Sequence, residues 1–127
     1  MSNGEATEDD PIKLHREGTA LSDVGKYKEA IEKFYRAYEV YEKTRNLFDA
    51  SYTLFKAAEC SYLLKDYETS VERFLKSADI AFNVGYDRFA VSALEYARDG
   101  YKALKKKRKV AEIEKKIKEA KEKLSKQ

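Results

Sequence analysis

The chain has 127 residues, of which 43% are hydrophobic and 39% are charged, with a formal net charge of +3. Ten Tyr and six Phe exclude a typical disordered chain, and one Pro with five Gly provides too few turn residues for an all-β fold. The single cysteine, Cys60, excludes an intrachain disulfide and a thiolate metal cage. The composition therefore favours one all-helical domain in a reducing compartment, with cytoplasmic location as the default.

Residues 1–11 are predicted to form a flexible acidic N-terminus, and residues 12–127 the folded domain. The first ten residues have neither the basic start nor the apolar core of a secretory signal peptide. No apolar run along the chain is long enough to span a membrane. We therefore expect no transmembrane segment.

After Pro11, apolar residues recur at helical spacing, and short polar or glycine-containing breaks interrupt them. Gly85 lies in one such break and is placed to cap the preceding helix at its C-terminal end. No strand-like alternation competes with this pattern. The stripes and breaks predict six helices, over residues 12–24, 27–43, 48–64, 67–83, 88–104 and 108–125.

The chain also matches itself when it is shifted by 40 residues. Leu14 aligns with Leu54, Tyr27 with Tyr67, and Phe34 with Phe74, whereas in the third copy Glu114 takes the place of Phe74. A fixed period of this length is typical of stacked helical hairpins. The self-match predicts three repeats, at about 12–47, 48–87 and 88–127, with the last helix acting as a cap.

The segment from Gly25 to Ala37 resembles the second half of a tetratricopeptide repeat. Its Gly-x-Tyr turn is followed by Ala30, Phe34 and Ala37 at the family's spacing, and Gly18 occupies the family's small position in the first helix. The repeat exceeds the roughly 34 residues of the family, and the extra six residues are predicted to fall between Tyr41 and Leu47. This length is similar to the repeats of the soluble NSF attachment proteins.

The resemblance implies an all-α, right-handed α-α superhelix of three helical hairpins. In that family the first helix of each pair lines a concave groove that binds a peptide or a partner helix. Large aromatics left over from the core stripe predict a contact strip there, edged by acidic residues that favour a basic partner. The predicted groove residues are Tyr52, Phe55, Glu59, Tyr62, Glu95 and Asp99.

A strongly basic segment follows the repeats. Residues 101–127 contain eleven Lys, one Arg and four Glu, a net charge of +8, which leaves −5 for residues 1–100. The apolar stripe of the last helix suits a capping role with a solvated basic face. The alternative is a basic patch that binds nucleic acid or an acidic surface, made of Lys105, Lys106, Lys107, Arg108 and Lys109.

No catalytic, cofactor or metal motif stands out. His15 is the only histidine and has no ligand partner at metal spacing, and Cys60 lies in a small-residue helical stretch typical of a packed thiol. We therefore expect a non-enzymatic adaptor or scaffold that binds another protein or peptide. A monomer and a weak homo-oligomer both fit, because three hairpins leave two open ends.

Overall fold

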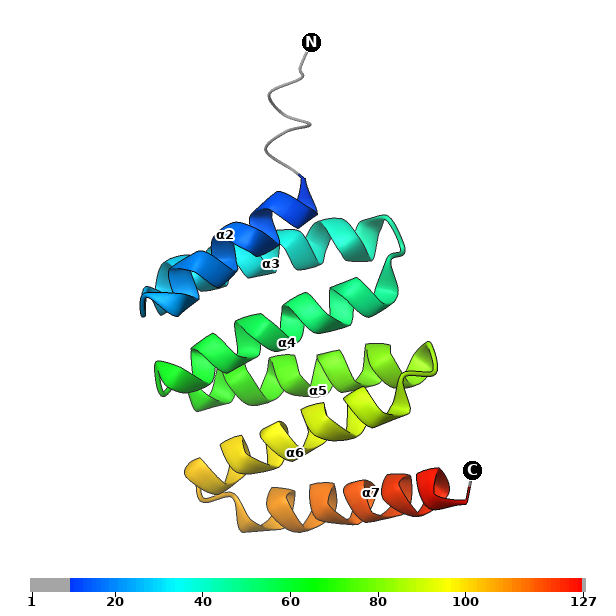
Figure 1. The fold of residues 1–127 in the computed structure, drawn as a ribbon. Coiled ribbons are helices and arrows are strands. Elements are labelled where there is room, and N and C mark those ends of the chain that lie inside the picture. The colour runs from blue at the N-terminus through cyan, green and yellow to red at the C-terminus, as the bar shows by residue number, and fades with distance from the viewer. Residues whose placement is uncertain (1–9, 127) are drawn as a thin grey trace.

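The computed structural model describes residues 10–126, and Figure 1 shows them as a stack of α-helices without a strand. The helices are α2 (Pro11–Asp23), α3 (Tyr27–Lys43), α4 (Leu47–Leu63), α5 (Tyr67–Asn83), α6 (Asp87–Ala103) and α7 (Lys107–Ser125). The prediction of an all-α stack of three helical hairpins is confirmed, and each helix begins and ends within one residue of its predicted position.

The N-terminal segment of the prediction lies mostly outside the described residues. Of residues 1–11, Asp10 and Pro11 are described, and both belong to the start of α2. Pro11 opens the helix, where its missing N–H is not needed. The Asp10 carboxylate accepts hydrogen bonds from the backbone N–H groups of Ile12 at 3.0 Å and Lys13 at 3.4 Å. The folded domain therefore begins earlier than the predicted residue 12.

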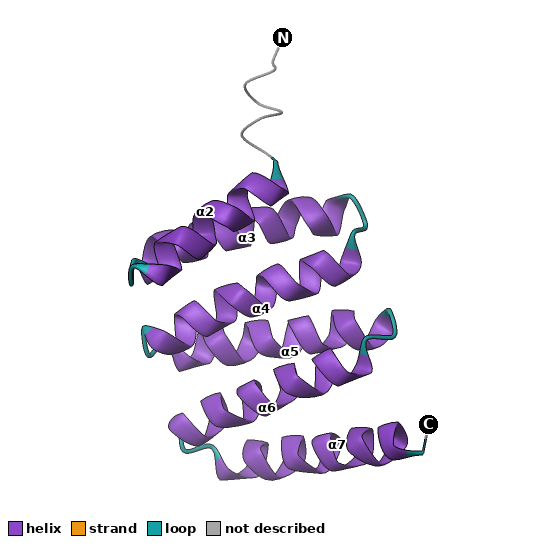
Figure 2. Ribbon diagram, viewed as in Figure 1, coloured by secondary structure: helices purple, strands orange, loops and turns teal. Residues whose placement is uncertain are grey.

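Every connection between helices is a three-residue turn of one kind, drawn in teal in Figure 2. In the first turn, the N–H of Lys26 donates to the Leu21 carbonyl at 2.9 Å and the N–H of Gly25 donates to the Ser22 carbonyl at 3.0 Å. This pair of bonds defines a Schellman motif, whose central residue adopts a positive φ. The motif recurs every 20 residues, with positive φ at Gly25, Arg45, Lys65, Gly85 and Lys105.

The turn spacing explains the 40-residue repeat. Helices α3 to α6 each have 17 residues, so one helix and one turn together take up 20. The prediction that the extra length falls between Tyr41 and Leu47 is wrong, because the turn there is as short as the others. The additional residues instead belong to uniformly long helices.

The helices form two layers, because side chains of one helix contact those of the helix two places further along the chain. His15 of α2 lies on Tyr52 of α4, and Phe55 of α4 contacts Tyr96 of α6, which places α2, α4 and α6 in one layer. In the other layer, the Arg73 guanidinium of α5 lies 4.6 Å from the centre of the Tyr35 ring of α3. Figure 1 shows the chain passing back and forth between these layers from α2 to α7.

Small residues bring neighbouring helices close together, as the repeat predicts. A Cβ atom at Gly18 would lie 2.9 Å from the ring of Phe34, which is completely buried. Between α4 and α5, the hydroxyls of Ser51 and Ser77 each donate at 2.8 Å to the other residue's carbonyl. Both serines are fully buried and satisfied, so they pack like alanines without an unpaired polar group.

Helix α7 ends the stack with a polar outer surface. Ile113 and Ile117 are buried in a core cluster shared with residues of α5 and α6, and Ala120 and Leu124 pack partly against it. Glu114, at the repeat position of the buried Phe74, is exposed. A further hairpin would have to bury this carboxylate, which is unfavourable. Across the described residues, no helix has the length and apolar character needed to cross a bilayer.

Candidate partner-binding face

The outward surface of α2, α4 and α6, here called the α2/α4/α6 face, differs in chemistry from the rest of the described surface. Exposed large hydrophobic side chains occur on these helices at Ile12, Tyr52, Leu63 and Tyr96. The remaining three, Val24, Leu64 and Tyr86, cap the ends of the same helices. None lies on α3, α5 or α7 within residues 10–126. Apolar side chains that remain exposed together on one face are typical of an interaction surface.

Aromatic rings connect the three helices of this face. The His15 ring stacks on Tyr52, with centroids 5.6 Å apart, and Tyr52 lies 6.0 Å from Phe89 of α6. Phe48 contacts Tyr52 and also Tyr86, whose ring centroid is 4.4 Å away. Because each ring is held by its neighbours, the exposed edges are presented with little freedom to rearrange.

A pocket of about 400 Å³ opens on this face and spans the three helices. Its wall on α4 is formed by Lys56, Glu59, Cys60, Tyr62 and Leu63. Ser22 of α2, Phe74 of α5 and Tyr96 of α6 complete the lining. The floor is apolar, because Phe74 and Cys60 are buried there. This central pocket is large enough for a partner side chain, since a cavity of ~150 Å³ already holds a benzene ring.

Phe55 does not line the face, so the prediction that it is left over from the core is wrong. Its side chain is only 8% exposed and packs against Phe74, Phe89 and Tyr96 at centroid distances of 5.1 to 5.2 Å. It fills the contact between successive hairpins. His15, one repeat earlier, makes the corresponding contact with Tyr52.

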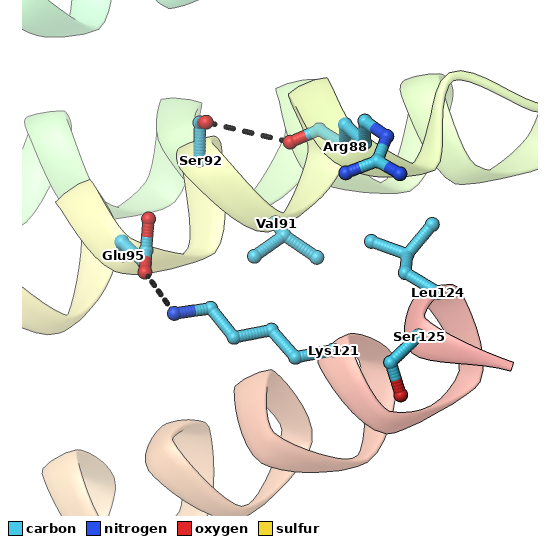
Figure 3. Close-up of a pocket in the computed structure, with 7 residues that line it drawn as sticks. All are labelled: Arg88, Val91, Ser92, Glu95, Lys121, Leu124 and Ser125. Carbon is cyan, nitrogen blue, oxygen red and sulfur yellow. Dashed lines mark hydrogen bonds and ion pairs between the residues drawn. The ribbon is translucent and has the colours of Figure 1, made fainter.

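Glu95 occupies the same repeat position as Phe55 but lies on α6, in the third hairpin. It lies in a separate hollow between α6 and α7, where Figure 3 shows the Lys121 side chain reaching its carboxylate. The Lys121 Nζ to Glu95 Oε2 distance is 2.8 Å. Glu95 therefore fastens the terminal helix and is not among the residues that line the central pocket.

The remaining predicted residues lie on or beside the face, and both acids have internal partners. Tyr52 is 39% exposed, and Tyr62 lines the central pocket. Glu59 forms an ion pair with Lys56 at 3.0 Å, and Asp99 accepts a hydrogen bond from Arg98 Nε at 3.3 Å. The predicted acidic edge is thus already matched by cations of the protein.

Two contributors to the face were not predicted from the sequence: Lys56 and Tyr96. The predicted positions on α4 follow steps of three, four and three from residue 52, whereas its outward residues are 52, 56, 59 and 63. Both series lie along one side of a helix, because they share residues 52 and 59 and differ by a single residue at the other two positions. Tyr96, one repeat after Lys56, belongs to the outward series and was missed for the same reason.

Two ionisable groups of the pocket, the Cys60 thiol and the Lys56 ammonium group, stay protonated at neutral pH. Burial raises the pKa of the Cys60 thiol, although its hydrogen bond to Ser22 acts in the opposite sense, so the thiol stays protonated at neutral pH. Burial would lower the pKa of Lys56, but the hydrogen bond and charge of Glu59 outweigh it and raise that pKa. The described residues contain no cluster of three or more His, Cys, Asp and Glu that could hold a metal ion.

The predicted basic patch lies at the α6–α7 turn. Lys105, Lys106, Lys107, Arg108 and Lys109 are all exposed. The first turn of α7 contains no acidic residue. Lys109 lies 3.9 Å from Glu112, a weak surface pair.

The α2/α4/α6 face thus combines exposed aromatic and aliphatic side chains with a pocket floored by Phe74 and with acids that have internal counter-charges. Comparison of the chain with protein-family models, with curated proteins and with solved structures gave no match.

Proposed function

We propose that this chain is a tetratricopeptide-like protein-interaction module, a non-enzymatic adaptor that binds a peptide or a partner helix along the α2/α4/α6 face. The observation that supports it most directly is the segregation of exposed large hydrophobics onto that one layer. Tyrosine is favoured at interfaces because it contributes a large apolar area and a polar tip at low entropic cost. A cytoplasmic location is part of the proposal, since the one thiol is buried and unpaired.

The proposal predicts that binding depends on the exposed tyrosines of this face. Tyr52→Ala combined with Tyr96→Ala should abolish capture of the partner in a pull-down read by mass spectrometry. Tyr35→Ala is the matched control, because Tyr35 is a partly exposed tyrosine of the opposite layer. All three proteins should retain their helical circular dichroism spectrum. Equal capture by the wild type and the double variant would refute the proposal.

The basic patch supports a second candidate, binding of a nucleic acid or another anionic surface. Its five exposed cations adjoin the N-terminus of α7, whose partial positive charge attracts anions. Lys106→Glu combined with Arg108→Glu should then abolish salt-dependent binding to single-stranded RNA, duplex DNA or anionic vesicles. Absence of such binding by the wild type at low salt would leave capping as the role of α7.

A further inference from the structure

We infer that the partner of the α2/α4/α6 face is an uncharged segment with apolar anchor side chains, one of which inserts into the central pocket. This inference rests on the proposed function and specifies the chemistry of the partner. It departs from the basic partner that the sequence predicts, because the charges and the pocket lining of the folded protein favour a different occupant.

Three acids of the predicted groove would be expected to attract a basic segment. Glu59, Asp99 and Glu95 lie at 3.0 Å, 3.3 Å and 2.8 Å from cationic groups of Lys56, Arg98 and Lys121, respectively. A cationic partner would have to displace these internal cations, so it would exchange one ion pair for another with little gain. Charge therefore provides no strong preference for a basic partner.

Helix α4, at the centre of the face, is itself poor in charge. Its 17 residues include three charged ones, Asp49, Lys56 and Glu59, and two of these pair with each other. Helix α3 in the opposite layer carries eight charged residues over the same length. The partner thus meets a nearly neutral surface, on which apolar contact is the main available interaction.

The central pocket fits an apolar anchor. Leu63 and Tyr96 line it with 55% and 42% of their surfaces exposed, so both have apolar area that a partner can still cover. Phe74 and Cys60 provide a buried apolar floor, and Cys60 is a protonated thiol. An inserted aliphatic or aromatic side chain would contact these groups on several sides, as anchor residues at interfaces do.

Spacing along α4 sets the length of the partner. Tyr52 and Leu63 are eleven residues apart on one helix, which corresponds to about 16 Å. A helical partner covers this distance with anchors about eleven residues apart, and an extended one with anchors about five residues apart. A peptide of about twelve residues is therefore long enough to engage both ends.

The test is a selection from a displayed library of random peptides of about twelve residues, on immobilised full-length protein. We expect enrichment of aromatic and aliphatic residues and no enrichment of Lys or Arg. The affinity of the best peptide should change by less than about twofold between about 0.1 M and about 1 M salt, a range that shortens the Debye length from about 10 Å to about 3 Å. A consensus rich in Lys or Arg, or a larger loss of affinity with salt, would overturn the inference.

Adjacent leucines provide a matched pair of variants for locating the anchor. Leu63→Ala should weaken the best peptide by about tenfold, the effect of losing one apolar anchor. Leu64→Ala, at an exposed neighbour that does not line the pocket, should leave its affinity unchanged. Equal effects of the two substitutions would contradict an anchor in the pocket.

The outcomes also separate this inference from the proposed function. Peptides that bind the wild type and the Tyr52→Ala/Tyr96→Ala variant equally well would refute the face as a binding site. A basic consensus that is lost in that variant would keep the face and overturn the uncharged partner. Failure to enrich any peptide would count against both.

Discussion

Gly100 of α6 marks a close approach of α6 to α5, which alanine substitution can test. A Cβ atom at position 100 would lie 2.5 Å from Val71 Cγ2. Val71 is buried and β-branched, so its side chain has little freedom to turn away. Overpacking of this kind costs about 1–3 kcal/mol, whereas alanine favours a helix over glycine by about 1 kcal/mol. We expect Gly100→Ala to lower the free energy of unfolding by about 1 kcal/mol.

The sign of this effect should reverse when the obstructing methyl group is removed. In a Val71→Ala background, the nearest remaining neighbours of the new Cβ are the Tyr67 carbonyl oxygen and the Cβ of residue 71, both at 3.8 Å, which is an ordinary contact distance. The higher helix propensity of alanine over glycine is then the only remaining effect, so Gly100→Ala should raise the free energy of unfolding by about 1 kcal/mol. Urea unfolding of the four proteins, followed by far-ultraviolet circular dichroism, measures the coupling, expected at about 1–3 kcal/mol. Effects that add to within about 0.5 kcal/mol would refute the close approach.

Three further predictions use the turns, the core and a titrating group. Glycine adopts a positive φ without strain, so Lys65→Gly, at φ 65°, should raise the free energy of unfolding by about 0.5–1 kcal/mol. Gly85→Ala, at φ 86°, should lower it by about 1–2 kcal/mol. Both changes are read from urea midpoints. Phe55→Ala should destabilise by about 3–5 kcal/mol and Tyr52→Ala by less than about 1 kcal/mol in the same assay, and equal losses would contradict their different burial. Burial, then the charge of Lys56, lowers the pKa of His15 below 6.5, so this histidine binds its proton more readily when unfolded. Stability should fall as the pH drops below about 6.5, and His15→Gln should remove that part of the fall in thermal melts at pH values of about 7 and about 5; equal falls in both proteins would argue against it.

The helices were predictable because their boundaries are set by local chemistry. Gly25 and Gly85 provide positive φ at two turns, and polar residues interrupt the apolar stripe at the others. The turn centres at Arg45, Lys65 and Lys105 carry no such signal, because long charged residues rarely adopt positive φ. Their role was readable only from the 20-residue spacing to the two glycines. Equal helix lengths then explain the repeat period without a longer connection.

The outward face was harder to predict because two helical series fit the same residues. On α4, nine residues are buried, since the helix contacts hairpin partners on several sides. A prediction that gives the helix a single buried stripe therefore leaves several apolar residues without a role. Phe55 was one of them, and it was placed in the groove although it belongs to the core. The deciding information is tertiary: a ring at this position reaches Phe89 and Tyr96 of the next hairpin. His15, Phe55 and Glu95 occupy one repeat position. The first two carry rings and the third a carboxylate, and this difference would have suggested that the rings contact a following hairpin.

The charges show a similar division between local and tertiary information. The Lys56–Glu59 pair has the i,i+3 spacing of a helical ion pair and could have been read from the sequence. The Lys121–Glu95 pair joins α7 to α6 and depends on the rotation of both helices, which no local pattern fixes. Counting acids along the predicted groove overestimated its negative charge, because each of them has a cationic partner: the neighbouring Arg98 for Asp99, Lys56 on the same helix for Glu59, and Lys121 on another helix for Glu95.

An aromatic residue indicates an interface only when the packing of the fold leaves much of its side chain exposed. Most apolar residues of α4 are accounted for by α3, α5 and the adjacent helices of its own layer, so their number says little about binding. Tyr52 and Leu63 differ because they lie in the outward series, where Lys56 and Glu59 show that a polar residue is tolerated. Tyr96 extends this surface to α6 at the repeat position of that lysine. These three side chains are therefore the strongest indication of a binding face, because the fold does not require their exposure.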